Sequence, residues 1–356
     1  MESSGCTETV KSWPKVWLYG YNPFNLSGDG SLVEIKLNEY IGKPVSGDVS
    51  YIFEITSTHA ILAAESYLYT RSELTKQSNE VCFGSSIVKL SACSWYCLVL
   101  LENCDLFKYD FNDNRSVRLD FLGVEFADSD QSADEHEIIT HLACGDRVSI
   151  ATTSRKSVFT IPSRIHTFPR HVRIVQIAVG LEHCLLLTAN GDVYSWGGGL
   201  RGQLGNGEIF PHQEQPQLVE ALAGVKIVEI AAGGWHSGAI SSFGDLYSWG
   251  WNSKGQLGIV DEKRQKGSVF SLPQLIEFAD EVCLQRIFCG FEHTLVVDTK
   301  GDIYFTGNDL RTRLDYSKVQ RHPSLLGFKK MEFDLEAFGG KLIKSGANTI
   351  ILMDQT

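Results

Sequence analysis

The sequence has little proline, no long apolar run and no surplus of basic residues, and each of these absences excludes a class of protein. Nine prolines in 356 residues are too few for a disordered, proline-rich chain, whereas 33 glycines favour a fold with many tight turns. The longest unbroken apolar run, residues 95–101, is too short to span a bilayer, so we expect no membrane segment. Residues 1–15 contain no apolar core, so we expect no signal peptide.

The charges and the cysteines set further limits. Lys and Arg number 32 against 43 Asp and Glu, which gives a formal net charge of −11. A general nucleic-acid binder needs a basic surface that releases counterions from phosphate, so we expect any nucleic-acid role to be local or indirect. The nine cysteines are an odd number without the spacing of paired clusters. We therefore expect reduced thiols in the nucleus or cytosol and no metal site.

A repeat runs through the second half of the chain. Each copy contains Gly-x-x-His, an apolar run, and then Gly-Asp followed by a second apolar and aromatic run. The histidines of the three copies are His183, His236 and His293, which places the copies 53 and 57 residues apart. Short apolar runs around a Gly-Asp turn indicate two strands joined by a tight turn. A unit of this length with several short strands is typical of a propeller blade.

Weaker copies of the same template lie near residues 59, 96, 148 and 349, and the last of them lacks a second strand. Residues 16–22 resemble that missing strand, and its pairing with the C-terminal segment gives seven blades. We predict an all-β fold, a seven-bladed β-propeller closed by pairing of N-terminal and C-terminal strands, because closure removes open sheet edges. The prediction places one domain at 1–356, strong repeats at 177–307, degenerate blades at 50–160, an acidic loop insertion at about 127–137, and closing strands at about 15–22 and 342–353.

The motifs of the strong copies resemble the repeat of the regulator-of-chromosome-condensation family. Residues 195–205 and 232–236 are most similar to a small member that consists of little but the propeller. The resemblance implies a non-catalytic protein of the nucleus, with the cytoplasm as a second location, that is linked to chromatin. It also implies a partner, a JmjC-class 2-oxoglutarate oxygenase associated with histone methylation and chromosome segregation.

An alternative follows from the same family, whose founding member is a guanine-nucleotide exchange factor for a small nuclear GTPase. That member carries a basic N-terminal tail, whereas the N-terminus here is short and mildly acidic. The early blades, which would supply part of an exchange surface, have lost the motif. Exchange activity therefore stays the second interpretation, behind a protein-interaction propeller.

Two groups of residues stand out within the repeats. Large aromatic residues at loop ends are favoured at interfaces, although tryptophans at equivalent strand positions can instead pack between blades. We predict a partner-binding surface from Arg201, Trp235, His236, Trp251, Asn252 and Lys254. We predict structural roles for Gly180, His183, Trp196, Gly233, Trp249, Gly290 and His293.

Residues that mimic catalytic or cofactor motifs have a simpler explanation. Residues 197–202 fit a dinucleotide-binding glycine pattern, but turn residues follow them where that motif needs a helix. Asp192, Asp245 and Asp302 each follow a turn glycine and so serve their own hairpins. No Ser-His-Asp or Cys-His set has local support. We therefore expect no enzyme, no catalytic residue, no cofactor and no small-molecule substrate.

Two basic stretches depart from the repeat, at residues 155–173 and 311–330. On an acidic protein such stretches can steer an acidic partner, or they can be solvated loops. Alignment of Gly145 with Gly180 places Arg155 at a hairpin tip, which is exposed and bends easily. Arg155 is therefore a candidate modification site, as a substrate of the oxygenase that the resemblance implies.

Overall fold

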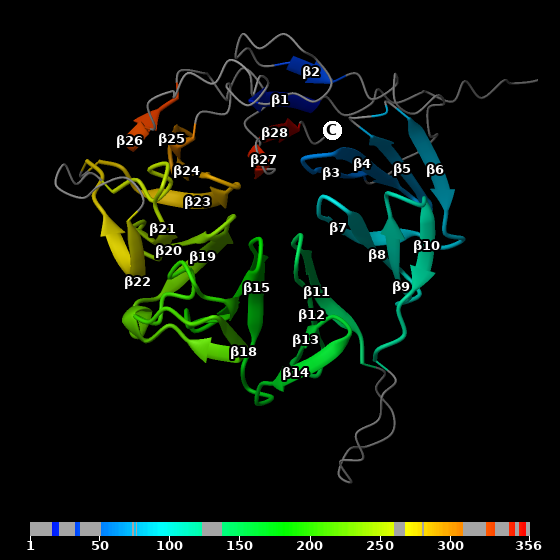
Figure 1. Ribbon diagram of the computed structural model, residues 1–356, viewed down its shortest axis with the longest axis horizontal. Helices are drawn as coiled ribbons and strands as arrows, with labels where there is room; N and C mark the ends of the chain where they lie inside the picture. The colour runs from blue at the N-terminus through cyan, green and yellow to red at the C-terminus, as the bar shows by residue number, and fades with distance from the viewer. Residues whose placement is uncertain are drawn as a thin grey trace, which may run out of the picture.

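The computed structural model describes residues 16–20, 33–35, 51–72, 75, 77–122, 137–259, 268–279, 281–308, 325–331, 342–345 and 349–353. Residues 311–324 of the basic stretch and residues 127–136 of the acidic insertion lie outside the described residues. Within these residues, 28 strands form four-stranded antiparallel sheets arranged around a central axis, which makes the molecule a β-propeller (Figure 1). The predicted all-β propeller fold is confirmed. No helix among the described residues has the length and apolar character needed to cross a membrane.

Six sheets are each built from four strands consecutive in sequence. The first sheet contains β3 (Tyr51–Ile55), β4 (His59–Ala64), β5 (Tyr67–Ser72) and β6 (Ser78–Cys82). The second contains β7 (Ile87–Ala92), β8 (Tyr96–Leu101), β9 (Leu106–Asp110) and β10 (Arg115–Arg118). The third contains β11 (Ile139–Cys144), β12 (Ser149–Thr153), β13 (Ser157–Thr160) and β14 (Ser163–Thr167). The fourth sheet contains β15 (Ile174–Val179), β16 (His183–Thr188), β17 (Val193–Gly198) and β18 (His212–Leu218). The fifth contains β19 (Ile227–Ala232), β20 (His236–Ser241), β21 (Leu246–Trp251) and β22 (Val269–Ile276). The sixth contains β23 (Leu284–Cys289), β24 (His293–Asp298), β25 (Ile303–Gly307) and β26 (Leu325–Lys330). A short 3-10 helix, η2 (Glu220–Leu222), follows β18.

A further sheet combines strands from both ends of the described chain. It contains β1 (Val16–Gly20), β2 (Val33–Ile35), β27 (Leu342–Ser345) and β28 (Thr349–Met353), in the order β2-β1-β28-β27. β1 pairs with β28 antiparallel, from Val16 opposite Met353 to Gly20 opposite Thr349. The first and last strands of the described residues therefore lie side by side (Figure 1).

The order of the strands gives the propeller two distinct faces. Because the strands of a sheet alternate in direction, the loops that follow the first and third strands lie at one end, and the second-to-third hairpins lie at the other. We call these ends the loop face and the hairpin face. The loop face carries the first-to-second strand loops, at 56–58, 93–95, 145–148, 180–182, 233–235 and 290–292. The hairpin face carries the second-to-third strand tips, at 65–66, 102–105, 154–156, 189–192, 242–245 and 299–302.

Glycines at the ends of the inner strands let neighbouring sheets approach closely near the axis. A Cβ atom on Gly180 would lie 2.3 Å from the carbonyl oxygen of Gly233, and one on Gly233 would lie 2.4 Å from that of Gly290. The same Cβ on Gly180 would lie 2.4 Å from Cε1 of His183. The Gly-x-x-His motif therefore combines a close backbone approach with an imidazole packed on the glycine.

The histidines of the motif join each sheet to the next. Nε2 of His183 lies 2.8 Å from Oγ of Ser237, and that hydroxyl donates to the carbonyl oxygen of Gln203 at 2.8 Å. The next sheet repeats the arrangement, since Nε2 of His236 lies 2.9 Å from Oγ1 of Thr294. Because the hydroxyl hydrogen of Ser237 points to a carbonyl, the imidazole of His183 must be the donor to that hydroxyl.

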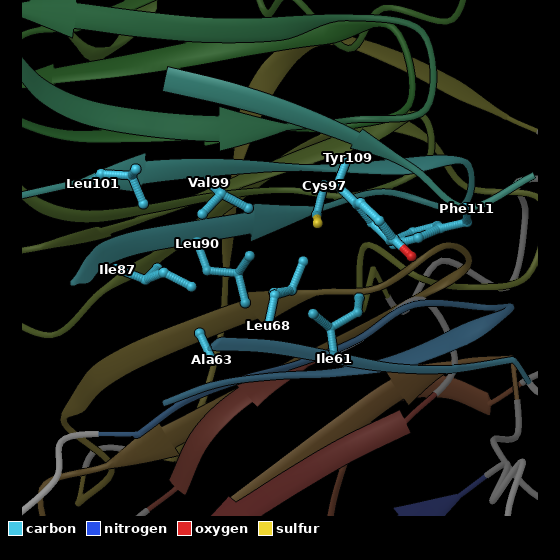
Figure 2. Packing of buried hydrophobic residues seen from close by; sticks show 10 residues of the cluster. All are labelled: Ile61, Ala63, Leu68, Ile87, Leu90, Cys97, Val99, Leu101, Tyr109 and Phe111. Atoms are coloured by element: carbon cyan, nitrogen blue, oxygen red, sulfur yellow. The ribbon is translucent and has the colours of Figure 1, made fainter. Parts of the chain in front are cut away.

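The space between sheets is filled by apolar side chains, including those of the degenerate blades. Trp196 and Trp249 are buried, and Nε1 of Trp249 donates to the carbonyl oxygen of Gln203 at 2.9 Å. Figure 2 shows the cluster between the sheets β3–β6 and β7–β10, where side chains of both sheets meet. Its labelled members are Ile61, Ala63, Leu68, Ile87, Leu90, Cys97, Val99, Leu101, Tyr109 and Phe111.

Candidate protein-interaction surface

Three of the predicted surface residues come together on the loop face, from two neighbouring sheets. Trp235 lies in the loop between β19 and β20, Trp251 ends β21, and Arg201 lies in the loop between β17 and β18. Cζ of Arg201 is 4.0 Å from the ring centroid of Trp235 and 4.6 Å from that of Trp251. The two rings are 5.3 Å apart and nearly perpendicular, at 79°. We call Arg201, Trp235 and Trp251 the Trp–Arg cluster.

The Trp–Arg cluster is partly buried and its parts hold one another in place. A guanidinium beside indole rings is attracted by their electron-rich faces, most strongly when the contact is partly desolvated. The ring of Phe291, from the loop between β23 and β24, lies 5.1 Å from that of Trp235 and packs edge to face. Three successive sheets therefore contribute to one aromatic surface.

Glu182 fixes the orientation of Trp235 from the neighbouring sheet. Its Oε1 accepts a hydrogen bond from Nε1 of Trp235 at 3.1 Å, and its Oε2 pairs with Nη1 of Arg147 at 3.1 Å. Both carboxylate oxygens of Glu182 are thus engaged. Glu182, Phe291 and Arg147 were not predicted, although Glu182 occupies the third position of Gly-x-x-His, a signal that could have identified it.

The structure places the other predicted surface residues differently. His236 is fully buried, with its Nε2 at Oγ1 of Thr294, so its assignment to the binding surface is corrected to a structural one. Asn252 shapes its own loop, because its Oδ1 accepts from the backbone N–H of Leu257 at 3.1 Å. Lys254 is exposed on the same loop. The predicted structural residues Gly180, His183, Trp196, Gly233, Trp249, Gly290 and His293 all lie buried at the contacts between sheets.

Exposed apolar side chains adjoin the Trp–Arg cluster on the outer side of the loop face. We call Leu200, Ile209, Phe210, Val269 and Leu272 the apolar rim; all five are exposed, Leu200 by 59% and Ile209 by 56%. Val269 is the register partner of Trp251, and the loop that carries Leu200 and Arg201 bonds to β22 through Gly207 and Ser271. Leu200 and Val269 therefore lie next to the cluster, the first by sequence and the second by strand register. Exposed apolar side chains that gather on one side of a protein mark interaction sites.

The axial opening on the loop face offers no comparable chemistry. It encloses about 190 Å³ and is lined by the ends of the inner strands. Asp146, which lies at its edge, accepts hydrogen bonds from the backbone N–H and the hydroxyl of Ser94, at 2.7 and 2.9 Å. Within the described parts of the chain, no group of three or more His, Cys, Asp or Glu side chains is arranged to hold a metal ion.

Arg155 lies on the opposite side of the molecule from the Trp–Arg cluster. It is exposed in the tip between β12 and β13, which belongs to the hairpin face. Exposed Arg170, His171 and Arg173 lie between β14 and β15, at the same end of the propeller. The structure therefore separates the predicted modification site from the predicted binding surface.

Comparison with known proteins agrees with the repeat pattern. Residues 190–240 and 244–297 match the model described as the Regulator of chromosome condensation (RCC1) repeat, and a second model of that description matches residues 174–203 and 227–256. Human "RCC1 domain-containing protein 1" is 37% identical over 169 residues, which cover 38% of this chain and 45% of that protein. The chain thus matches less than half the length of this relative.

Solved structures share the fold at low sequence identity. Human WBSCR16 has a TM-score of 0.69 and 15% identity, covering 96% of this chain and 100% of that chain. Yeast RCC1 (Prp20), solved bound to Kap60, has a TM-score of 0.68 and 15% identity, covering 99% of this chain and 94% of that chain. Residues 174–297 therefore match the RCC1 repeat, and the fold of the chain is similar to that of yeast RCC1 (Prp20).

Proposed function

We propose that this RCC1-repeat propeller is a non-catalytic interaction module whose loop face binds a protein partner. The observation that carries the proposal is the Trp–Arg cluster, where two indole rings and a guanidinium from adjacent sheets adjoin the exposed apolar rim. Trp and Arg are the residue types most enriched among those that dominate binding energy. A rigid scaffold that carries such loops is suited to recognition.

The partner is a JmjC-class 2-oxoglutarate oxygenase of the nucleus, and the complex acts in histone methylation and chromosome segregation. The likeness of residues 195–205 and 232–236 to a propeller-only family member supports this assignment. The net charge of −11 favours indirect rather than direct contact with chromatin. Arg155 is the proposed substrate arginine of the same enzyme, because it is exposed at a hairpin tip.

The proposal includes a closed ring of seven blades. The sheet β2-β1-β28-β27 is the blade that holds both ends of the described chain, and the pairing of β1 with β28 supports it. In a closed ring every blade packs between two neighbouring blades, so no blade exposes an apolar face to water. A rigid ring keeps the loops of successive blades at the spacing on which the Trp–Arg cluster depends.

The test is a pulldown of the full chain with a purified JmjC oxygenase and affinity purification from nuclear extract. The variant Trp235→Ala, Trp251→Ala is expected to stay folded and to lose its main partner. Phe243→Ala is the matched control, because Phe243 is 84% exposed on the hairpin face. Retention of the partner by the double variant, or equal loss in both variants, contradicts the proposal. A nucleotide-release assay with the nuclear GTPase tests the alternative of an exchange factor.

A further inference from the structure

We propose that the loop face selects a partner segment in which an Asp or Glu side chain is flanked by apolar side chains, with Arg201 binding the carboxylate. The inference rests on the proposed function and specifies the chemistry of the partner. It follows from how the guanidinium of Arg201 is held, from which of its groups are already bonded, and from what surrounds it.

Arg201 is held in position without a carboxylate of its own. Some arginines of the described chain pair with acids, as Arg147 does with Glu182 at 3.1 Å and Arg286 with Glu229 at 3.0 Å. Among the described residues, the side-chain N–H groups of Arg201 have no hydrogen-bond acceptor, and its guanidinium lies against two indole rings. The nearby carboxylate of Glu182 is already engaged by Trp235 and Arg147.

A guanidinium of this kind is prepared for a planar acceptor. Aromatic contacts restrict its orientation before binding, so less conformational entropy is lost when its N–H groups bond a ligand. Its donors match the two oxygens of a carboxylate or of a phosphate in a bidentate geometry. The two indole rings also exclude part of the water, which strengthens a charged hydrogen bond.

The surroundings favour a carboxylate over a phosphate. Phosphorylated segments are commonly bound by clusters of arginines, whereas this surface offers one guanidinium without an acid partner. The carboxylate of Glu182 bonds the Trp235 ring on which Arg201 lies, and the whole chain carries a charge of −11, so the second negative charge of a phosphate group is opposed. The same net charge opposes docking of a second copy of the chain.

The apolar rim specifies what flanks the acidic side chain. Leu200 adjoins Arg201 in sequence and is 59% exposed, and Val269 is the register partner of Trp251 on the other side. Leu272 follows along the outer strand β22. A bound segment that places its acidic side chain on Arg201 therefore brings its neighbouring side chains over apolar surface. Leucine or a similar side chain gains binding free energy there by burying apolar area, whereas a charged side chain loses its hydration and weakens binding.

The experiment measures binding of the full chain to an array of short synthetic peptides with blocked ends. The central residue is Glu, Gln, Lys or phosphoserine, and the flanking residues are Leu or Ser. We expect the Leu-flanked Glu peptides to bind at least about tenfold more tightly than their Gln and Lys counterparts, the difference that one charged hydrogen-bonded pair supplies. They are also expected to bind more tightly than the Ser-flanked Glu peptides, which bury less apolar area. Arg201→Gln is expected to abolish the preference of Glu over Gln, and Arg201→Lys to reduce it because the fork is lost.

Several outcomes overturn the inference. They are an absence of binding by every Leu-flanked Glu peptide, equal binding of Glu and Gln peptides, a preference for phosphoserine, and a Glu preference that survives Arg201→Gln. If sedimentation shows that the chain self-associates, and the peptides disrupt that association, a second copy is the occupant and the inference is overturned. If the Glu preference is absent but Trp235→Ala, Trp251→Ala still releases the protein partner, the inference fails and the proposed function stands.

Discussion

His183 and His236 are neutral side chains inside the protein. Burial, and less strongly the neighbouring His236, lower the pKa of His183 to about 3, and burial lowers the pKa of His236 to about 4. Both lie far below the ordinary value near 6.5. Each imidazole donates its Nε2 hydrogen to a hydroxyl of the next sheet, and its buried Nδ1 has no hydrogen-bond partner among the described residues, so a second proton on the ring would lack an acceptor.

We therefore predict that stability falls as the pH is lowered from about 6.5 to 4. In this window the unfolded chain binds protons at these histidines and the folded chain does not, so the free energy of unfolding decreases with decreasing pH and is fully retained above 6.5. His183→Gln is expected to make the slope shallower by about 1.4 kcal/mol per pH unit, the value for one proton. Denaturant unfolding at a series of pH values measures it.

His171→Gln is the matched control for this measurement, because His171 is exposed. It is expected to leave the slope unchanged. Equal slopes for the unchanged protein and His183→Gln would show that His183 takes up its proton equally in both states.

For single residues, the sequence predicted which side chains are prominent but not whether each one points into the core or toward the surface. Trp235, Trp251 and Arg201 were predicted as parts of one surface, and the guanidinium of Arg201 does contact both indole rings; that this surface binds a partner stays a prediction. His236 directly follows Trp235, yet it opens β20 and turns inward, whereas Trp235 still belongs to the loop. Glu182 acts on Trp235 across a sheet boundary, 53 residues away, and no local pattern reports such a contact.

At the scale of the strand and the loop, the inner-strand glycines explain why the motif is repeated. A Cβ on Gly233 would lie 2.3 Å from Cε1 of His236 and 2.4 Å from the carbonyl oxygen of Gly290. Because one of these atoms is backbone, the clash cannot be relieved by a side-chain rotation. The spacing between neighbouring sheets near the axis is thus set by the absence of a side chain.

We predict that Gly233→Ala destabilises the protein by about 3 kcal/mol, as expected for overpacking against fixed atoms. Gly84→Ala is the control, because a Cβ there meets nothing within 4 Å and only the positive φ of 73° opposes it. That substitution is expected to cost about 1–2 kcal/mol. Chemical denaturation measures the free energy of unfolding of both variants. If Gly233→Ala lowers it no more than Gly84→Ala does, the close-packing explanation is contradicted.

The degenerate blades show why the sequence predicted some elements better than others. Between 177 and 307 the repeated motif predicted strand pairs that the structure contains. In the earlier sheets, other side chains link successive loops: Oγ1 of Thr58 donates to the carbonyl oxygen of Ser94 at 2.6 Å, and Asp146 accepts from Ser94. Each of these contacts occurs only once among them, so no repeated sequence pattern predicts it. Weaker copies of the same template, with their apolar strands, indicated those blades in the sequence.

At the scale of the whole molecule, the sheet that holds both ends of the described chain is where the proposed ring closes. β1 lies between β2 and β28, so its backbone groups pair on both sides, whereas β2 is at the edge. We predict that Leu18→Pro, in the middle of β1, lowers stability by about 1–3 kcal/mol, because proline removes a donor from a central strand.

Glu34→Pro in the edge strand β2 is the control and is expected to cost less. Thermal unfolding measures both variants. A Leu18→Pro variant that melts like the unchanged protein would remove the terminal sheet from the ring, and with it the proposed closure.

The two faces of the propeller divide the proposed function in space. The Trp–Arg cluster lies on the loop face and Arg155 lies on the hairpin face, so one partner surface that grips the cluster cannot reach Arg155 of the same molecule through a small contact. We predict that a purified JmjC oxygenase with its co-substrates modifies Arg155 equally in the unchanged protein and in Trp235→Ala, Trp251→Ala.

Mass spectrometry of the peptide that contains residue 155 provides the measurement, and Arg155→Lys supplies the unmodified reference. Modification of residues elsewhere with Arg155 left unchanged would remove Arg155 as the substrate. Loss of Arg155 modification in the double variant would instead require a partner large enough to span both faces. Binding and modification would then be a single event around the rim of the ring, and the loop face would serve to position the enzyme rather than to recruit it independently.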